Sequence, residues 1–329
     1  MSAVAPTLQA FFTDRLIRQR HASAHTIASY RDTLRLLLTY TTTTTGIPPS
    51  NLDFADLDAT LIGGFLDHLE HDRGNSVRTR NNRLAAIHSL FRFAAPQHPE
   101  HAASISRVLA IPAKRFERAI LTYLSEPEAG ALLAACDQST WTGRRDHALL
   151  HLAVQTGLRI SELIALTCAD VHLGPGAYAA CHGKGRKERI TPLTRATVAQ
   201  LRDWLTERAA DPAAPLFPNR RGQALSRDAI EHRITAYTNQ AASTCPSLRD
   251  KTVSAHVLRH TTAMRLLHAG AGTSVIALWL GHVSIETTQI YLHADLKIKE
   301  GALARTKPPN TPAGRYRPPD TLLTWLEQL

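Results

Sequence analysis

The stretch Gly281-His282-Val283-Ser284-Ile285-Glu286-Thr287-Thr288-Gln289-Ile290-Tyr291 decides which fold to expect, because it places a tyrosine nine positions after a histidine. Three other clusters of cationic or imidazole groups precede it. They are Arg159 in Thr156-Gly157-Leu158-Arg159, Lys184 in His182-Gly183-Lys184-Gly185, and His256 with Arg259 in His256-Val257-Leu258-Arg259-His260. Each cluster alone has an ordinary interpretation as a surface cation, a basic turn or a packing residue. The ordered series is therefore the informative feature.

Composition sets the class of protein. The 329 residues suffice for two domains, and 43% hydrophobic with 20% charged residues is typical of a folded chain. The 38 basic and 28 acidic residues give a net charge of +10, which favours a polyanionic partner, either nucleic acid or an acidic membrane face. No apolar run approaches the roughly 18 to 20 residues of a membrane span, and Met1 to Phe12 lack a secretion signal. We therefore expect a cytoplasmic protein without a membrane partner.

The four cysteines lie far apart and form no Cys-x-x-Cys pair. Neither a disulfide framework nor a cysteine zinc site is indicated. They are most simply buried thiols.

Hydrophobic periodicity predicts a small helical bundle from Thr7 to about Pro96. The residues Thr41 to Thr45 are expected to end one of its helices in a polar loop, and prolines at 96, 99 and 112 mark a linker. The second domain is expected to combine helices with short strands between residues 170 and 193. Its predicted helices cover 125–136, which starts with a capping box of Ser125 and Glu128, then 144–155, 196–209, 226–239, 256–268 and 274–280.

The sequence therefore predicts a mainly α protein with a small β-sheet. We place the domains at residues 1–112 and 113–300, followed by a proline-rich tail over 301–329. The tail could end in a short helix with Leu322, Leu323, Leu326 and Leu329 on one side. So short a helix needs a surface to dock on, either on a neighbouring subunit or on its own domain.

A basic segment lies near the end of the first domain. No acidic residue occurs between Asp72 and Glu100, and this segment includes Arg73, Arg78, Arg80 and Arg83. An unneutralised basic face suits a phosphate backbone, although an ordinary solvated helix surface has the same composition.

The two arginines of the ordered series suit phosphate chemistry. Negative charge builds on the equatorial oxygens of a phosphodiester in the transition state, and a guanidinium stays charged and presents a planar fork to two such oxygens. Arg159 and Arg259 would form a clamp if folding brought them together.

Two rival sites can be weighed from the residues. His256 and His260 could bind zinc on one face of a helix, but Val257 replaces the glutamate of a zinc-protease helix and no third ligand has obvious spacing. A nucleotide-binding P-loop is excluded at Lys184, because Gly185 follows where serine or threonine is required.

Taken together, the series resembles the active site of a tyrosine recombinase of the phage-integrase family. The match is closest in Thr156 to Leu163, in Gly183 to Arg189, and in Leu280 to His282 with Thr287 to Tyr291. The resemblance implies that residues 1–112 form a helical core-binding domain that clamps DNA and that 113–300 form the catalytic domain. It implies double-stranded DNA as partner, a homo-tetramer on synapsed DNA, and no metal, nucleotide or other cofactor.

The resemblance also implies a role for each catalytic residue. Tyr291 would attack phosphorus and form a 3′-phosphotyrosine link, with His256 as its base and Lys184 as the acid for the leaving 5′ oxygen. Arg159, Arg259 and His282 would hold the phosphate. Arg186 and Lys187, together with Arg73, Arg78, Arg80 and Arg83, would contact DNA.

The biological role is less constrained by the residues. The 38 residues after Tyr291 form a longer, proline-rich tail than a short-tailed chromosome-dimer resolvase would have, which favours an integrase or transposase of a mobile element. A Xer-like dimer resolvase and a type IB topoisomerase-like enzyme are the alternatives. The helical first domain argues against the topoisomerase.

Overall fold

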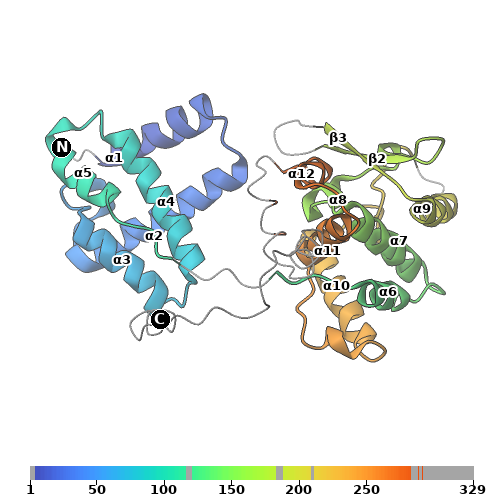
Figure 1. Ribbon diagram of the computed structural model, residues 1–329. Coiled ribbons are helices and arrows are strands. Elements are labelled where there is room, and N and C mark those ends of the chain that lie inside the picture. Colours follow the sequence, from blue (N-terminus) through green and yellow to red (C-terminus); the bar gives the residue numbers. More distant parts are fainter. Residues whose placement is uncertain are drawn as a thin grey trace, which may run out of the picture. The chain divides into compact units, whose positions relative to one another are not determined.

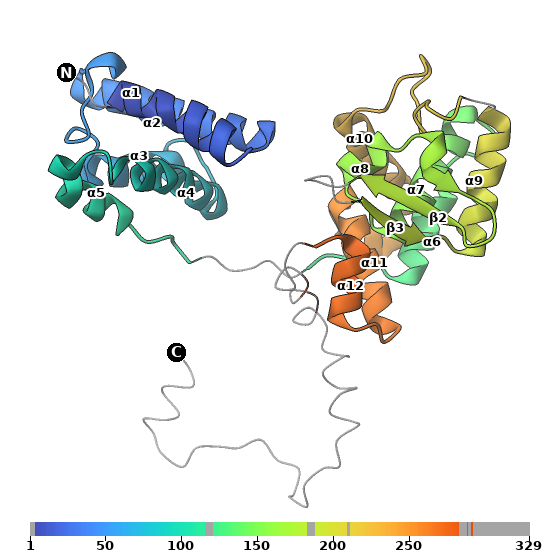
Figure 2. The ribbon, with the colours of Figure 1, turned by 90° about the horizontal axis from the view of Figure 1, so that it is seen from above.

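The computed structural model describes residues 4–115, 121–182, 188–208 and 211–282, together with Thr288 and Tyr291. The chain divides into two compact units, Met1–Ala119 and Ile120–Leu329, each of which is described by itself (Figures 1 and 2). No helix within the described ranges is long and apolar enough to cross a membrane.

The first unit is a bundle of helices whose starts are set by side-chain caps. Ser23, Asp58 and Ser76 each accept a hydrogen bond from the backbone N–H three residues on, as N-caps do. The helical elements are α1 Val4–Ala10, the π-helix Phe11–Gln19, α2 Ala24–Thr45, a 3-10 turn Pro49–Asn51, α3 Ala59–His71, α4 Val77–Ala94, a 3-10 turn Pro99–His101 and α5 Ala102–Leu109.

Helix α2 is longer than predicted, because the threonine run at its end is helical. The hydroxyls of Thr41 to Thr45 each donate to the carbonyl four residues earlier, so each hydroxyl finds its hydrogen-bond partner within the helix. Thr41 is also fully buried. The helix ends at Gly46, whose φ of 74° is the left-handed conformation that glycine adopts readily. Composition alone had suggested a loop here.

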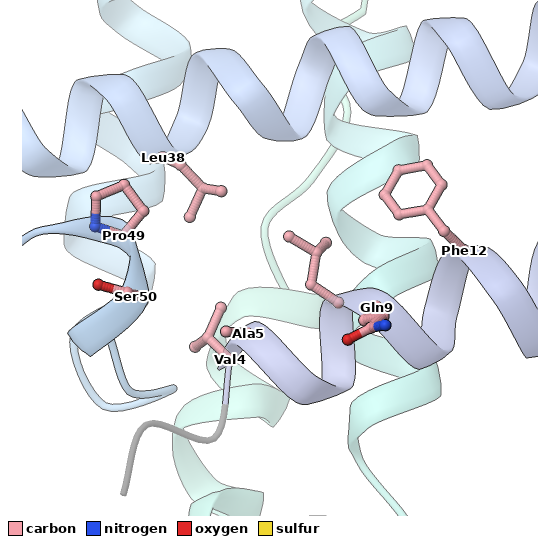
Figure 3. Close-up of a pocket in the computed structure, with 8 residues that line it drawn as sticks. Val4, Ala5, Gln9, Phe12, Leu38, Pro49 and Ser50 are labelled. Carbon is pink, nitrogen blue, oxygen red and sulfur yellow. The ribbon is translucent and has the colours of Figure 1, made fainter.

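Aromatic side chains fill the core of this bundle. Phe11, Phe54, Phe65 and Phe91 are at most 1% exposed, and the ring of Phe54 meets that of Phe91 edge to face. Burial of each such ring stabilises the fold by about 2 to 3 kcal/mol. A pocket of about 360 Å³ opens between α1, the π-helix, α2 and the turn at Pro49, and none of the predicted catalytic residues lines it (Figure 3).

The second unit combines helices with a small sheet. The capping box predicted at Ser125 and Glu128 is present at the start of its first helix. Its elements are α6 Glu126–Ala134, α7 Trp141–Thr156, α8 Ile160–Ala165, a 3-10 turn Cys168–Asp170, β1 Val171–His172, β2 Tyr178–His182, β3 Glu188–Pro192, α9 Arg195–Arg208, α10 Arg227–Ala241, a 3-10 turn Pro246–Leu248, α11 Ala255–His268 and α12 Thr273–Leu280.

The sheet is antiparallel with strand order β1-β2-β3, and Ala180 pairs with Ile190. Helix α11 packs between α7 and α12 (Figures 1 and 2). The predicted fold class, mainly helical with a small sheet, is confirmed. This packing brings the C-terminal ends of α7 and α12 to the side chains of α11.

Candidate active site

Arg259 is the buried centre of the site. It lies on α11 and is 3% exposed. Its Nη1 donates to the carbonyl of Gly157 at 2.7 Å, and its Nη2 donates to the carbonyl of Leu280 at 2.6 Å. These oxygens belong to the C-terminal ends of α7 and α12, where the helix dipole is negative and a cation is stabilised. Two helix ends therefore fix the guanidinium in place.

Arg159 reaches the end of α12, next to the carbonyl that Arg259 uses. It is the N-cap residue of α8, and its Nη2 donates to the carbonyl of Gly281 at 2.8 Å. Its side chain is 40% exposed, so it remains accessible to a ligand. Burial and the neighbouring positive charge of Arg159 lower the pKa of Arg259 to about 10. The Arg259 guanidinium stays charged at neutral pH, and the structure brings both arginines to adjacent carbonyls at the end of α12.

Glu162 is a buried carboxylate that joins two arginines. It accepts a bidentate pair of bonds from Arg189 at 2.8 Å each, and further bonds from the backbone and Nη1 of Arg159. These bonds outweigh the cost of burial and lower its pKa to about 2, so it is ionised at all ordinary pH values.

Sequence reasoning gave Glu162 and Arg189 no role. The signal was present, because Glu162 follows Arg159 by three positions at a helix start and Arg189 closes the basic motif after Lys184. Which cation would meet this carboxylate depends on tertiary packing.

Glycine is required at both helix ends. Gly157 and Gly281 each have a φ of 64°. A Cβ on Gly281 would lie 2.7 Å from Nη1 of Arg189, and one on Gly157 would lie 2.7 Å from a methyl group of Leu280. Only a residue without a side chain fits these two helix ends without displacing Arg189 or Leu280.

Two histidines on α11 lie one turn apart. The ring centroids of His256 and His260 are 4.4 Å apart in an edge-to-face arrangement. His256, which keeps access to solvent, has its pKa lowered by the partial enclosure of its ring and by the charges of Arg259 and Arg159. Burial, followed by the charges of His256 and Arg259, lowers the pKa of His260 to about 4. Both rings are neutral at neutral pH.

Tyr291 is packed inside the second unit. It is 1% exposed and contacts a cluster that includes Met264, Ile276 and Leu280. Its hydroxyl lies 3.0 Å from Nδ1 of His260, whereas His256 was the expected partner. Burial raises the pKa of the phenol and Arg259 opposes this rise. The structure thus gathers Tyr291 with its predicted partners, but with the hydroxyl enclosed.

His282 stands between the clamp and the tyrosine. Its backbone N–H donates to the carbonyl of Ala277, and its Nδ1 lies 2.8 Å from the hydroxyl of buried Thr288. Its ring is parallel to that of Tyr291, with centroids 6.4 Å apart. Burial, then Arg259 and Arg159, lower the pKa of His282 to about 4. A neutral ring held at Nδ1 by Thr288 has no hydrogen-bond partner at Nε2 among the residues that the structure describes, so this nitrogen can serve a ligand.

Three predicted residues and the predicted tail fall outside the described residues. Lys184, Arg186 and Lys187 lie between β2 and β3 in the sequence, and the tail over 301–329 follows Tyr291. Within the described ranges, no group of three or more histidine, cysteine, aspartate or glutamate side chains could hold a metal ion.

The basic segment, which spans the loop before α4 and the first half of α4, contains both accessible and buried arginines. Arg73 and Arg78 are exposed, and Arg83 is half-buried with one terminal nitrogen enclosed and unpaired. Arg80 differs from the prediction of a DNA contact, because its side chain is 6% exposed. It approaches Glu70 at 3.8 Å and donates to the carbonyl of Pro112. We therefore remove Arg80 from the expected DNA contacts, since it anchors the chain after α5.

The fold and this constellation define a DNA strand-transfer enzyme of the tyrosine recombinase class, and comparison with known proteins agrees. The profile described as Phage integrase family matches residues 122–297, and that described as Phage integrase, N-terminal SAM-like domain, matches residues 10–98. The chain belongs to the phage integrase family. It is a tyrosine recombinase, an enzyme that cleaves and rejoins DNA strands.

Several relatives carry related names. The chain is 53% identical over 328 residues to integrase/recombinase y4rC of Sinorhizobium fredii, covering 100% of this chain and 99% of that one. It is 32% identical to tyrosine recombinase XerD of Pseudomonas putida, over 86% and 91% of the two chains. A crystal structure of the XerH site-specific recombinase bound to palindromic difH substrate matches with a TM-score of 0.68 and 25% identity, over 87% and 81% of the chains. The family resemblance seen in the sequence is confirmed.

Proposed function

We propose that this chain is a site-specific recombinase of double-stranded DNA that works through a 3′-phosphotyrosine intermediate formed by Tyr291. The observation that carries the proposal is the convergence of Arg159 and Arg259 on neighbouring carbonyls at the end of α12, beside the rings of His282 and Tyr291. Two fixed guanidiniums next to a phenol suit a phosphodiester, whose transition state gathers negative charge.

In the proposed reaction the phenolic oxygen of Tyr291 bonds to phosphorus while the bond from phosphorus to the 5′ oxygen breaks. The phenolic proton passes to His256, and the leaving oxygen takes a proton from Lys184. Arg159, Arg259 and Nε2 of His282 hold the non-bridging oxygens. The phosphotyrosine keeps the energy of the broken bond, so rejoining to a second strand needs no nucleotide.

The enclosed hydroxyl of Tyr291 implies a rearrangement before cleavage. A nucleophile reacts from about 3 to 3.5 Å, so the phenol has to leave its packing against Met264 and Ile276 when DNA binds. This movement also breaks its contact with His260. We therefore assign His260 to the resting state and His256 to proton transfer.

Matched variants separate the two histidines. We expect His256→Ala to slow adduct formation by about 100-fold or more, as loss of a general base does. His260→Ala should slow it much less, because His260 contacts Tyr291 only before the rearrangement. The reverse order of effects would make His260 the base.

For the biological role we propose integration or excision of a mobile element, with the chain acting in the cytoplasm as a homo-tetramer on synapsed DNA. The 53% identity to a protein named as an integrase/recombinase supports this role. The 32% identity to proteins named XerC and XerD keeps dimer resolution as the second candidate.

We further propose that residues 1–112 clamp DNA, that 113–300 carry the chemistry and that 301–329 form a docking tail. DNA contacts are assigned to Arg73, Arg78, Arg83, Arg186 and Lys187.

The decisive experiment traps the covalent complex on duplexes that span the DNA on either side of the gene. Tyr291→Phe should bind the same duplex without forming an adduct, and junction sequencing of wild-type products identifies the site and the linked end. An adduct in the Phe variant refutes the nucleophile. Relaxation of supercoiled DNA without exchange of partners would instead indicate a topoisomerase.

A further inference from the structure

Glu231 is an acidic residue on α10 that reaches the start of the catalytic helix α11. Its Oε2 accepts a hydrogen bond from the backbone N–H of Ala255 at 3.1 Å. Ala255 is the first residue of α11, and His256 is the next. The carboxylate therefore lies at the turn that carries the proposed base.

The packing of α10 explains why Glu231 points there. Its neighbours Ile230 and Ile234 are 1% exposed in the core of the second unit, and Glu231 itself is half-buried beside them. The first turn of a helix has N–H groups without helical partners. Ser254 accepts one of these, from Val257, and Glu231 accepts another, from Ala255. A negative charge at this end of a helix is also favoured by the helix dipole.

Glu231 is the charge that opposes the cations around His256. Arg259 on the same helix and Arg159 at the start of α8 both lower the pKa of His256, and the His260 ring packs against its own. Glu231 acts in the opposite direction and raises the pKa of His256. Among these neighbours of His256, Glu231 is the one that carries a negative charge.

We propose that Glu231 is a positioning residue of the recombinase reaction, which fixes the first turn of α11 and supplies the negative charge that supports His256 as proton acceptor. This inference rests on the proposed role of His256. When the imidazole takes the phenolic proton it becomes a cation, and the negative charge of the carboxylate stabilises that cation. Sequence spacing could not have revealed the pair, because 25 positions separate the two residues.

The test removes the charge of Glu231 and keeps its hydrogen bond. In Glu231→Gln the amide oxygen can still accept from Ala255, whereas Glu231→Ala loses both functions. Asp228→Asn is a matched control, because Asp228 is an exposed carboxylate one turn earlier on α10. The readout is the titration of the ¹³C-labelled His256 ring by NMR in the full chain, with the signal assigned through His256→Asn.

We expect the His256 titration to move to lower pH in the Gln variant and to stay in place in the Asp228→Asn control. The proposal is overturned if the Gln variant titrates like wild type, or if the control moves His256 as far. Neither result depends on cleavage, so failure of the inference can be told apart from failure of the proposed function.

A second readout connects Glu231 to the reaction. On the duplex from which wild type forms the Tyr291 adduct, Glu231→Gln should slow adduct formation by about fivefold at neutral pH and shift the acidic limb of the pH profile to lower pH. In a His256→Ala background the same change should have no effect on rate. An equal slowing in both backgrounds would show that Glu231 only maintains structure and would overturn the proposal.

Discussion

Replacing Glu162 by glutamine tests how the site is held together. The carboxylate is 5% exposed and bonds Arg189 and Arg159 at once. Its pKa falls from 4.5 to about 2, which is equivalent to about 3 kcal/mol of folding stability at pH 7. We therefore expect Glu162→Gln to lower the free energy of unfolding by about 3 kcal/mol, within the range seen when one partner of a buried ion pair is removed.

The contribution of Glu162 to folding stability should also depend on pH, in a direction that its pKa fixes. A carboxyl whose pKa is lowered in the folded state stabilises fully above its unfolded value of 4.5, and this contribution is lost as the pH falls through 4.5 towards 2. The stability difference between wild type and Glu162→Gln should therefore shrink by about 0.8 kcal/mol between pH 7 and pH 4.

Urea unfolding of both proteins, followed by circular dichroism at the two pH values, measures this difference. Glu207→Gln is the control, because Glu207 pairs with Arg144 at the surface, where such a pair contributes about 0 to 1 kcal/mol. A loss below 1 kcal/mol for Glu162→Gln, or a loss that does not change with pH, would refute the reasoning.

Three further outcomes can be checked. Gly281→Ala should destabilise by about 2 to 3 kcal/mol in urea unfolding, because it adds a clash with Arg189 to a positive φ, whereas Gly176→Ala, with a φ of 71° in open space, should cost only about 1 kcal/mol. His260 and His282 have pKa values lowered to about 4 in the folded protein, so the unfolded chain binds their protons first as the pH falls below 6.5, and acid titration should show a loss of stability on the order of 2 kcal/mol for each histidine between pH 6.5 and 4. Incubation with EDTA should leave adduct formation unchanged, and inhibition that zinc or magnesium reverses would contradict the metal-free mechanism.

Much of the fold follows from local sequence signals. Ser125 with Glu128 marks the start of α6, and the apolar positions of 256–268 mark α11 within one residue. The threonine run was misjudged because threonine has a modest intrinsic helix preference, which the burial of Thr41 overcame. Tertiary packing therefore decided that the threonine run is helical.

For the site, too, the sequence predicted some features and tertiary packing decided the others. The residue types and order of Arg159, Arg259, His282 and Tyr291 were sufficient to predict that they meet. Their partners were not predictable, because Arg259 bonds to backbone carbonyls, which every residue possesses. The burial of Arg80 was equally invisible, since it depends on a contact with Pro112 that lies 32 positions away.

The bonds that hold Arg259 go to uncharged oxygens, and this has a consequence for the protein in solution. Its charge is oriented but not cancelled, and it repels the nearby guanidinium of Arg159. A small oxyanion that enters between the two gains from both charges and relieves their mutual repulsion. Sulfate or phosphate in a purification buffer would thus raise the melting temperature and compete with nucleic acid, whereas chloride at equal ionic strength would do so far less.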